Sequence, residues 1–202
     1  MRGVKTIALS KRIYEDETPI YVTEVPHRGR SRVGKRIIFD QGRATRPSTH
    51  CTCYAKKDRV LHWDLSDQNA DTKEIERVAV DAATQMSVGD ALIWDRLGRS
   101  GRALHPTHQH HSPAVREEFK ERGVSMKFLP PKGKYFNPIE LLFNDLKSHH
   151  IRPNFPQNGQ NLSKSKIRAL VRSYMDERAP STLPGFFSAR ANGKEAIANK
   201  IL

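Results

Sequence analysis

The most informative stretch of the chain is Phe128–His150, which runs F-L-P-P-K-G-K-Y-F-N-P-I-E-L-L-F-N-D-L-K-S-H-H. An apolar alternation over residues 124–128 predicts a strand, and the two prolines after it predict its end. A helix is predicted to begin at Asn137-Pro138, because asparagine is a good N-cap and proline is tolerated at the first helical position. The apolar residues of this helix follow the spacing i, i+3, i+4 and i+7 and are Ile139, Leu142, Phe143 and Leu146.

Glu140 lies in the first turn of the predicted helix, and two interpretations of it remain open. It stands three residues after Asn137, which is the spacing of a capping box. It also stands beside the C-terminal end of the preceding strand, where open α/β sheets usually place their chemistry. The local spacing alone does not separate a structural acid from a catalytic one.

The rest of the chain predicts a mixed sheet with helices on its faces. Apolar patterns predict strands over residues 12–16, 20–25, 48–55, 60–65 and 91–95. Apolar residues recur at helical spacing over residues 75–86, 115–119 and 167–175. We expect Glu17-Thr18-Pro19 to separate the first two strands. Early strands followed by alternating helices and strands are typical of a single α/β sheet.

The composition indicates a folded domain with a polyanionic partner. The chain has 202 residues, which suits one domain or one domain with a short appendage. Its formal net charge of +13 favours nucleic acid first and an anionic membrane surface second. Because the sequence has no run of 18 apolar residues and no signal-peptide core, we expect no membrane partner and an intracellular location.

The only two cysteines, Cys51 and Cys53, lie on one predicted strand. We expect their side chains to point to opposite faces and to remain reduced thiols. Two reduced thiols fit an intracellular compartment.

The pattern L-P-P-x-x-x-x-x-N-P-I-E-x-x-x-x-x-L-K over residues 129–147 resembles the third-acid motif of the mariner-type DDE transposases, or DDE superfamily endonucleases. The resemblance implies an α/β fold of the ribonuclease H-like type, a mixed five-stranded sheet with helices on both faces. It also implies that Glu140 is the last of three metal-binding acids, preceded by two aspartates.

Asp95 corresponds to the second acid that the resemblance implies. It ends a predicted buried strand, although Arg96 follows it where the family commonly has asparagine. The structural alternative is an aspartate that ends a strand and caps a turn.

Asp16 corresponds to the first acid. Asp16-Glu17-Thr18 and the later run Arg28–Gly34, R-G-R-S-R-V-G, together resemble the family's first-acid region. Strand propensity alone favours Glu24, and Asp64 in the predicted hairpin and Asp67 just after it also remain open.

Three carboxylates suit the cleavage of a phosphodiester. Hard oxygen ligands favour Mg²⁺ or Mn²⁺, and two ions about 3.5–4 Å apart can activate a water and neutralise the leaving oxygen. The resemblance implies a DNA transposase catalytic domain that cleaves and transfers DNA strands. It further implies two ions per site, transposon ends and target DNA as partners, a homodimer, and a nuclear location in a eukaryotic host.

Basic residues accompany the predicted acids and are expected to neutralise DNA phosphates, with salt-sensitive binding and little sequence readout. The residues concerned are Arg28, Arg30, Arg32, Arg96, Arg99, Lys132 and Lys134. The alternative is that each cluster is a solvated loop.

Three segments are expected: residues 1–10 as an N-terminal extension, 11–153 as the catalytic domain and 154–202 as a C-terminal helical extension. Two further functions stay open. One is a catalytically inactive or domesticated transposase-derived DNA-binding protein. The other is a ribonuclease H-type nuclease acting on RNA–DNA hybrids, against which the N-P-I-E motif argues.

Overall fold

The computed structural model describes residues 7–22, 49–67, 72–94, 112–129, 136–156 and 161–198, the last with side chains up to residue 189. Within these ranges, five strands form one sheet: β1 (Arg12–Ile20), β2 (Thr49–Ala55), β3 (Val60–Ser66), β4 (Ala91–Trp94) and β5 (Ser125–Phe128). The longer helices are α2 (Thr72–Ala83), α3 (Pro113–Glu121), α4 (Ile139–Asp145), α5 (Lys164–Ser173) and α6 (Ala179–Ala198). Short helical segments are η1 (Leu9–Lys11), η4 (Leu146–Ile151), η5 (Arg152–Asn154) and η6 (Tyr174–Arg178).

The sheet has the order β3-β2-β1-β4-β5, so β1 is its central strand. β1 pairs antiparallel with β2, and β2 pairs antiparallel with β3. On the other side, β1 pairs in parallel with β4, and β4 with β5. The predicted mixed five-stranded sheet is confirmed.

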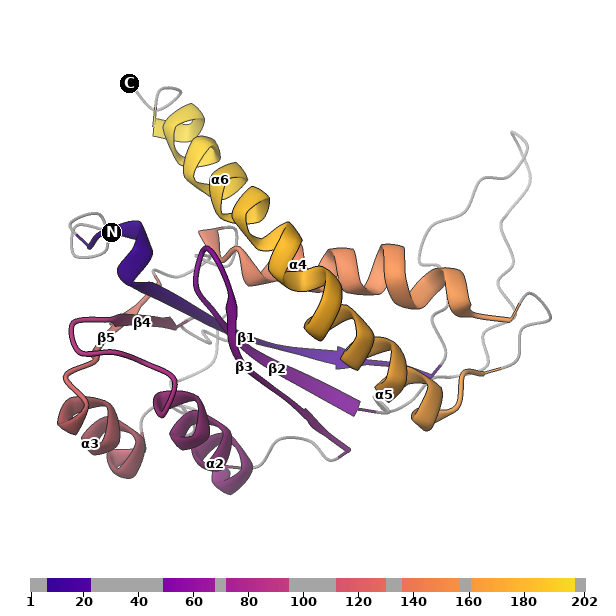
Figure 1. Cartoon of the computed structure of the whole chain (residues 1–202), viewed down its shortest axis with the longest axis horizontal. Coiled ribbons are helices and arrows are strands. Elements are labelled where there is room, and N and C mark those ends of the chain that lie inside the picture. Colours follow the sequence, from indigo (N-terminus) through magenta and orange to yellow (C-terminus); the bar gives the residue numbers. More distant parts are fainter. Residues whose placement is uncertain are drawn as a thin grey trace, which may run out of the picture.

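Helices cover both faces of the sheet (Figure 1), with α2 and α3 on one face and α4, α5 and α6 on the other. Side chains alternate along each strand, so successive residues of β1 enter different cores. Ile13 packs with the α2–α3 side, whereas Tyr14 packs with the α4–α6 side. Asp16, two residues after Tyr14, therefore belongs to the α4 face.

The apolar stripe predicted for α4 is confirmed. Ile139, Leu142 and Leu146 are fully buried and Phe143 is 3% exposed. The helical path continues beyond α4 through η4 to Ile151. No helix in the described ranges is long and apolar enough to cross a membrane.

One prediction about β1 is wrong, because this strand runs through Glu17-Thr18-Pro19 without a break. Proline lacks an N–H and is tolerated where a strand has no partner on that side. The described pairing of β1 with β4 covers only Arg12 to Tyr14, whereas Pro19 pairs with His50 of β2. The strand predicted over residues 20–25 is not separate at its start, since Ile20 ends β1, and residues 23–25 lie outside the described ranges.

The predicted orientation of the cysteines is also wrong. Cys51 and Cys53 are both fully buried in the core on the α4 side. Residues two apart on a strand share a face, because side chains alternate with a period of two. Both are free thiols, as expected.

Candidate active site

Asp16 lies on the central strand, half-buried on the face covered by α4. Its Oδ1 accepts a hydrogen bond from the backbone N–H of Glu17 at 2.9 Å, and its Oδ2 accepts one from Nδ2 of Asn137 at 3.2 Å. A carboxylate offers about four lone-pair sites, so these bonds orient it without exhausting its capacity as a ligand.

Asn137 joins β1 to the beginning of α4. Its Nδ2 also donates to the carbonyl oxygen of Glu15 at 2.9 Å, and its Oδ1 accepts from the backbone N–H of Ile139 at 3.0 Å. This bond to Ile139 is the contact expected of a capping asparagine, although α4 as assigned begins at Ile139 and has Pro138 at its N-cap position. The contact of Asn137 with Asp16 spans 121 positions, and no local sequence pattern predicts it.

Glu140 lies half-buried in the first turn of α4, three residues after Asn137. Among the described residues, no hydrogen bond joins its carboxylate to the backbone of Asn137, so the capping box is not formed. The structure thus brings the first-turn glutamate of α4 to the same face of the sheet as Asp16, with Asn137 between their elements.

Two other candidates for the first acid, Asp64 and Asp67, form ion pairs with arginines. Asp64 lies 2.8 Å from Nη2 of Arg77 on α2, on the opposite face of the sheet from α4. Asp67 lies 2.8 Å from Nη2 of Arg168 on α5. Each of these two carboxylates is thus paired with an arginine of a helix other than α4.

Several predicted residues fall outside the described ranges. Asp95 follows Trp94, the last residue of β4, directly in the sequence. The other such residues are Glu24, Arg28, Arg30, Arg32, Arg96, Arg99, Lys132 and Lys134. In the part of the chain that is described, no three His, Cys, Asp or Glu side chains are grouped to hold a metal ion.

The groups around Asp16 favour oxygen ligation. Cys53 pairs with Asp16 across β1 and β2. Burial above all, and then the neighbouring Cys51, Glu15 and Asp16, raises the pKa of the Cys53 thiol well above its usual range. The thiol is therefore protonated at neutral pH. The atoms of Asp16 and Glu140 that could bind a metal ion are carboxylate oxygens, which suit Mg²⁺ or Mn²⁺.

Glu17 supports Asp16 with its backbone, while its side chain points to the opposite face of the sheet. Burial raises the pKa of Glu17 above the ordinary value of 4.5. Its Oε1 is buried and makes no hydrogen bond within the described structure. The Glu17 carboxylate therefore does not share the site with Asp16, although the two residues are adjacent in the sequence.

Comparison with known proteins identifies the family. The family model described as DDE superfamily endonuclease matches residues 11–163. No curated protein sequence matches the chain.

The fold is that of the catalytic domain of Mos1 mariner transposase, which the chain matches with a TM-score of 0.54 at 10% identity, covering 95% of this chain and 86% of that domain. A pre-cleavage Mos1 transpososome matches with a TM-score of 0.58 at 10% identity, covering 95% of this chain and 58% of that one. A Mos1 paired-end complex with Mn matches with a TM-score of 0.55 at 10% identity, covering 93% and 56%. The chain thus spans less than two thirds of the Mos1 chains in these complexes.

The resemblance of the N-P-I-E stretch and the extent of the family match lead to one assignment. The chain belongs to the DDE superfamily endonucleases.

Proposed function

We propose that this chain is the catalytic part of a DNA transposase, which cleaves DNA strands with divalent metal ions and transfers them to target DNA. The three acids of the proposed site are Asp16, Asp95 and Glu140. The observation that carries the proposal is the hydrogen bond from Asn137 to Asp16, which connects the first acid to the helix bearing the third. Family membership supports the same reaction class.

The sheet register supports Asp95 as the second acid. β4 runs parallel to β1, with Ile93 paired to Tyr14, and Asp95 follows two residues after Ile93 just as Asp16 follows two residues after Tyr14. Consecutive Cα atoms lie about 3.8 Å apart, and neighbouring strands about 4.8 Å apart. Asp95 therefore directly follows a strand, β4, that is hydrogen-bonded to the strand containing Asp16.

The carboxylates of the three residues would hold two Mg²⁺ or Mn²⁺ ions. When bound, such ions supply activation of the attacking water and neutralisation of the leaving oxygen in an in-line displacement. The N–H of Glu17 and the amide of Asn137 keep the Asp16 carboxylate in one orientation. Solved Mos1 paired-end complexes with Mn and with Mg provide a parallel for this metal use.

The proposed partners are transposon-end DNA and target DNA, bound by a homodimer within the cell, and in the nucleus of a eukaryotic host. The Mos1 structures include a complex with the left transposon end and a strand transfer complex. Residues 11–153 are proposed as the catalytic domain, with residues 154–202 as its helical extension. The basic residues from Arg28 to Lys134 given above would contact DNA phosphates.

The test is metal-dependent nicking of a supercoiled plasmid by the wild-type protein and by Asp16→Asn, Asp95→Asn and Glu140→Gln. Each substitution keeps side-chain size and removes a negatively charged ligand, so nicking is expected to fall to background in all three. Asp67→Asn is the matched control, because the Asp67 carboxylate pairs with Arg168 and is not one of the three proposed acids, and it should nick as the wild type does.

Arg96, which follows the second acid where the family commonly has asparagine, favours one other candidate, a DNA-binding protein without catalysis. DNA retention without nicking in either Mg²⁺ or Mn²⁺ would support that candidate. Nicking that is equal in the wild type and the three acid variants would reject the proposed site.

A further inference from the structure

The side chain of Asn137 uses both ends of its amide. It is fully buried, and it makes three hydrogen bonds: to the carbonyl of Glu15, to the carboxylate of Asp16 and from the N–H of Ile139. Two of these hydrogen bonds are made with backbone atoms, one in β1 and one at the start of α4. They fix the amide plane independently of the Asp16 side chain.

The two backbone anchors lie in regular, packed structure. Glu15 lies within the central strand and pairs with Tyr54 of β2. On the other side, Pro138 has a φ of −67° in the helical region, and Ile139 is fully buried. A donor held between a central strand and a packed helix keeps its direction without any contribution from the carboxylate that it meets.

A plain helix cap does not need this arrangement. Capping requires only an acceptor for a free N–H of the first turn, which serine or aspartate also provides. The Nδ2 group of Asn137 points instead to β1, 2.9 Å from the Glu15 carbonyl and 3.2 Å from Oδ2 of Asp16. The Nδ2 group of Asn137 therefore contacts β1 and Asp16, which capping of α4 does not require.

We propose that Asn137 is a positioning residue for the metal site: it orients the Asp16 carboxylate and sets its distance from the helix that bears Glu140. This inference rests on the proposed function and adds a residue to it. One amide thereby couples the first and third acids, since the bond that caps α4 and the bond that directs Asp16 belong to the same planar group. Asn137 acts through Asp16 and is not itself a ligand.

The test compares Asn137→Ser with Asn144→Ser. Serine at 137 retains an oxygen that can accept from the N–H of Ile139, but it is too short to reach Asp16. Asn144 is exposed on the same helix and provides the same chemical change away from the site. For each protein we would measure the Mn²⁺ dissociation constant by calorimetry, the metal dependence of nicking and the melting temperature.

Asn137→Ser is expected to weaken Mn²⁺ binding about 10- to 100-fold, the usual effect of losing a group that orients a metal ligand. The metal concentration for half-maximal nicking should rise by the same factor, and saturating metal should restore much of the rate. A purely structural role would lower the folded fraction without changing the metal dependence. Asn144→Ser should match the wild type in all three measurements.

A second measurement uses the unaltered protein and does not depend on the variant folding. The side-chain NH₂ signals of Asn137 in a ¹⁵N spectrum should shift when Mg²⁺ is added, while those of Asn144 should stay in place. Two results would overturn this inference: equal Mn²⁺ affinity of folded Asn137→Ser and wild type, or Asn137 signals that do not move with Mg²⁺. If Asp16→Asn loses metal binding in the same experiments, the proposed function stands and only the role of Asn137 is rejected. A wild type that neither binds Mn²⁺ nor nicks would overturn the proposed function and this inference together.

Discussion

Lys56 and Asp90 form a buried ion pair at the end of the sheet where β4 begins. Nζ of Lys56 lies 2.6 Å from Oδ2 of Asp90, and this oxygen also accepts from the N–H of Ser87 at 2.8 Å. Asp90 is fully buried and Lys56 is 7% exposed. Lys56 is therefore the main partner of the buried Asp90 carboxylate. A more distant positive charge is that of Lys11, whose Nζ lies 3.7 Å from Oδ1 of Asp90.

Lys56→Met should lower the free energy of unfolding by about 3–5 kcal/mol, because it leaves the Asp90 carboxylate buried without its main partner. The measurement is urea denaturation at neutral pH. The matched control is Lys57→Met at the exposed neighbouring position, where a change within about 0.5 kcal/mol is expected. Equal effects at the two positions would contradict the importance of the buried pair.

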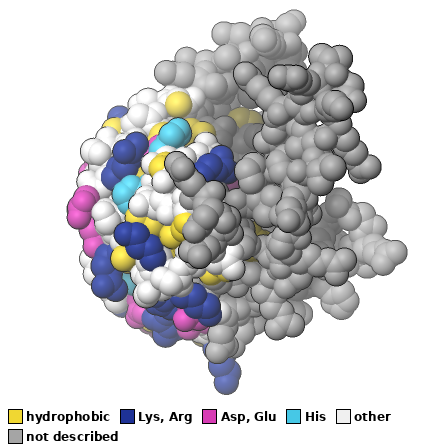
Figure 2. All heavy atoms as spheres, turned by 90° about the vertical axis from the view of Figure 1, so that its right-hand side faces the viewer, with side chains coloured by type: hydrophobic (Ala, Val, Ile, Leu, Met, Phe, Trp, Pro, Cys, Tyr) yellow, Lys and Arg dark blue, Asp and Glu magenta, His cyan; other side chains and the backbone are white. Residues whose placement is uncertain are grey.

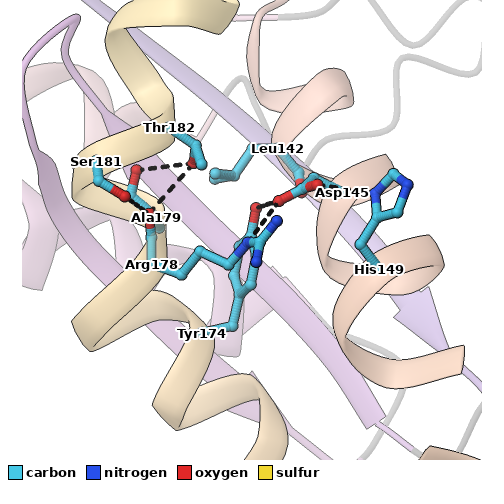
Figure 3. Close-up of polar contacts among 8 residues, drawn as sticks. All are labelled: Leu142, Asp145, His149, Tyr174, Arg178, Ala179, Ser181 and Thr182. Carbon is cyan, nitrogen blue, oxygen red and sulfur yellow. Dashed lines mark hydrogen bonds and ion pairs between the residues drawn. The ribbon is translucent and has the colours of Figure 1, made fainter. Parts of the chain in front are cut away.

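At the scale of the elements, Asp145 fastens the C-terminal helices to the end of α4 (Figure 3). Its carboxylate accepts hydrogen bonds from Oη of Tyr174 at 2.8 Å and from Nε of Arg178 at 3.2 Å, and it lies 2.8 Å from Nδ1 of His149. Burial raises the pKa of Asp145, but the bonds from Tyr174, Arg178 and His149 outweigh it, and the net pKa lies below the ordinary 3.8.

Because the pKa of Asp145 is lower in the folded than in the unfolded chain, its stabilisation is present above the ordinary value of 3.8 and is lost as the pH falls through the folded value. Asp145→Asn should therefore reduce the free energy of unfolding at pH 7, by about 1–2 kcal/mol. The difference from wild type should shrink below about pH 4. Denaturation over a pH series would check this, with exposed Asp58→Asn as control. A difference that stays constant to low pH would contradict it.

The limits of the sequence prediction follow from the same elements. The stripe of α4 and the strand before Asp95 were predictable, since local spacing records burial. The path of α6 was not, because it contains Pro184 and Gly185, which favour a break. Its packing compensates: Leu183 is fully buried, and the ring of Phe187 meets that of Tyr14 edge-on at 5.4 Å.

In the candidate site, too, some features were predictable from local sequence and others depend on tertiary packing. Asp16 and Glu140 were predicted from motifs, whereas the contact that joins their elements depends on the packing of α4 on β1. Asn137 carried a visible signal only for the cap. A bond between residues so far apart is a tertiary event, and neither propensity nor spacing contains it.

At the scale of the whole molecule, the surplus of positive charge is not gathered on the described surface that Figure 2 shows. Lysine and arginine side chains are spread over that face, with acidic ones between them. The clusters proposed to bind DNA lie outside the described ranges. Binding is therefore best tested through its dependence on salt.

Binding to a random-sequence duplex should weaken steeply between 50 and 200 mM NaCl, by about 10³–10⁵-fold if roughly 6–10 phosphates are contacted. Replacing Arg28, Arg30 and Arg32 together with glutamine should reduce the slope of log K against log salt by roughly 0.9 for each lost contact. Fluorescence anisotropy would measure both. The control is the same change at exposed Lys57, Lys73 and Lys120, which should leave the slope unaltered.

The bond between Asn137 and Asp16 spans 121 positions, and ribosomes make a chain from its N-terminus. At about 5–20 residues per second, the aspartate leaves the peptidyl-transferase centre some 6–24 s before the asparagine that steadies it. Under the proposed function, a copy whose translation stops before residue 137 therefore lacks both Asn137 and Glu140. Such a copy would carry the first acid without the third, so it would not be competent to cut DNA.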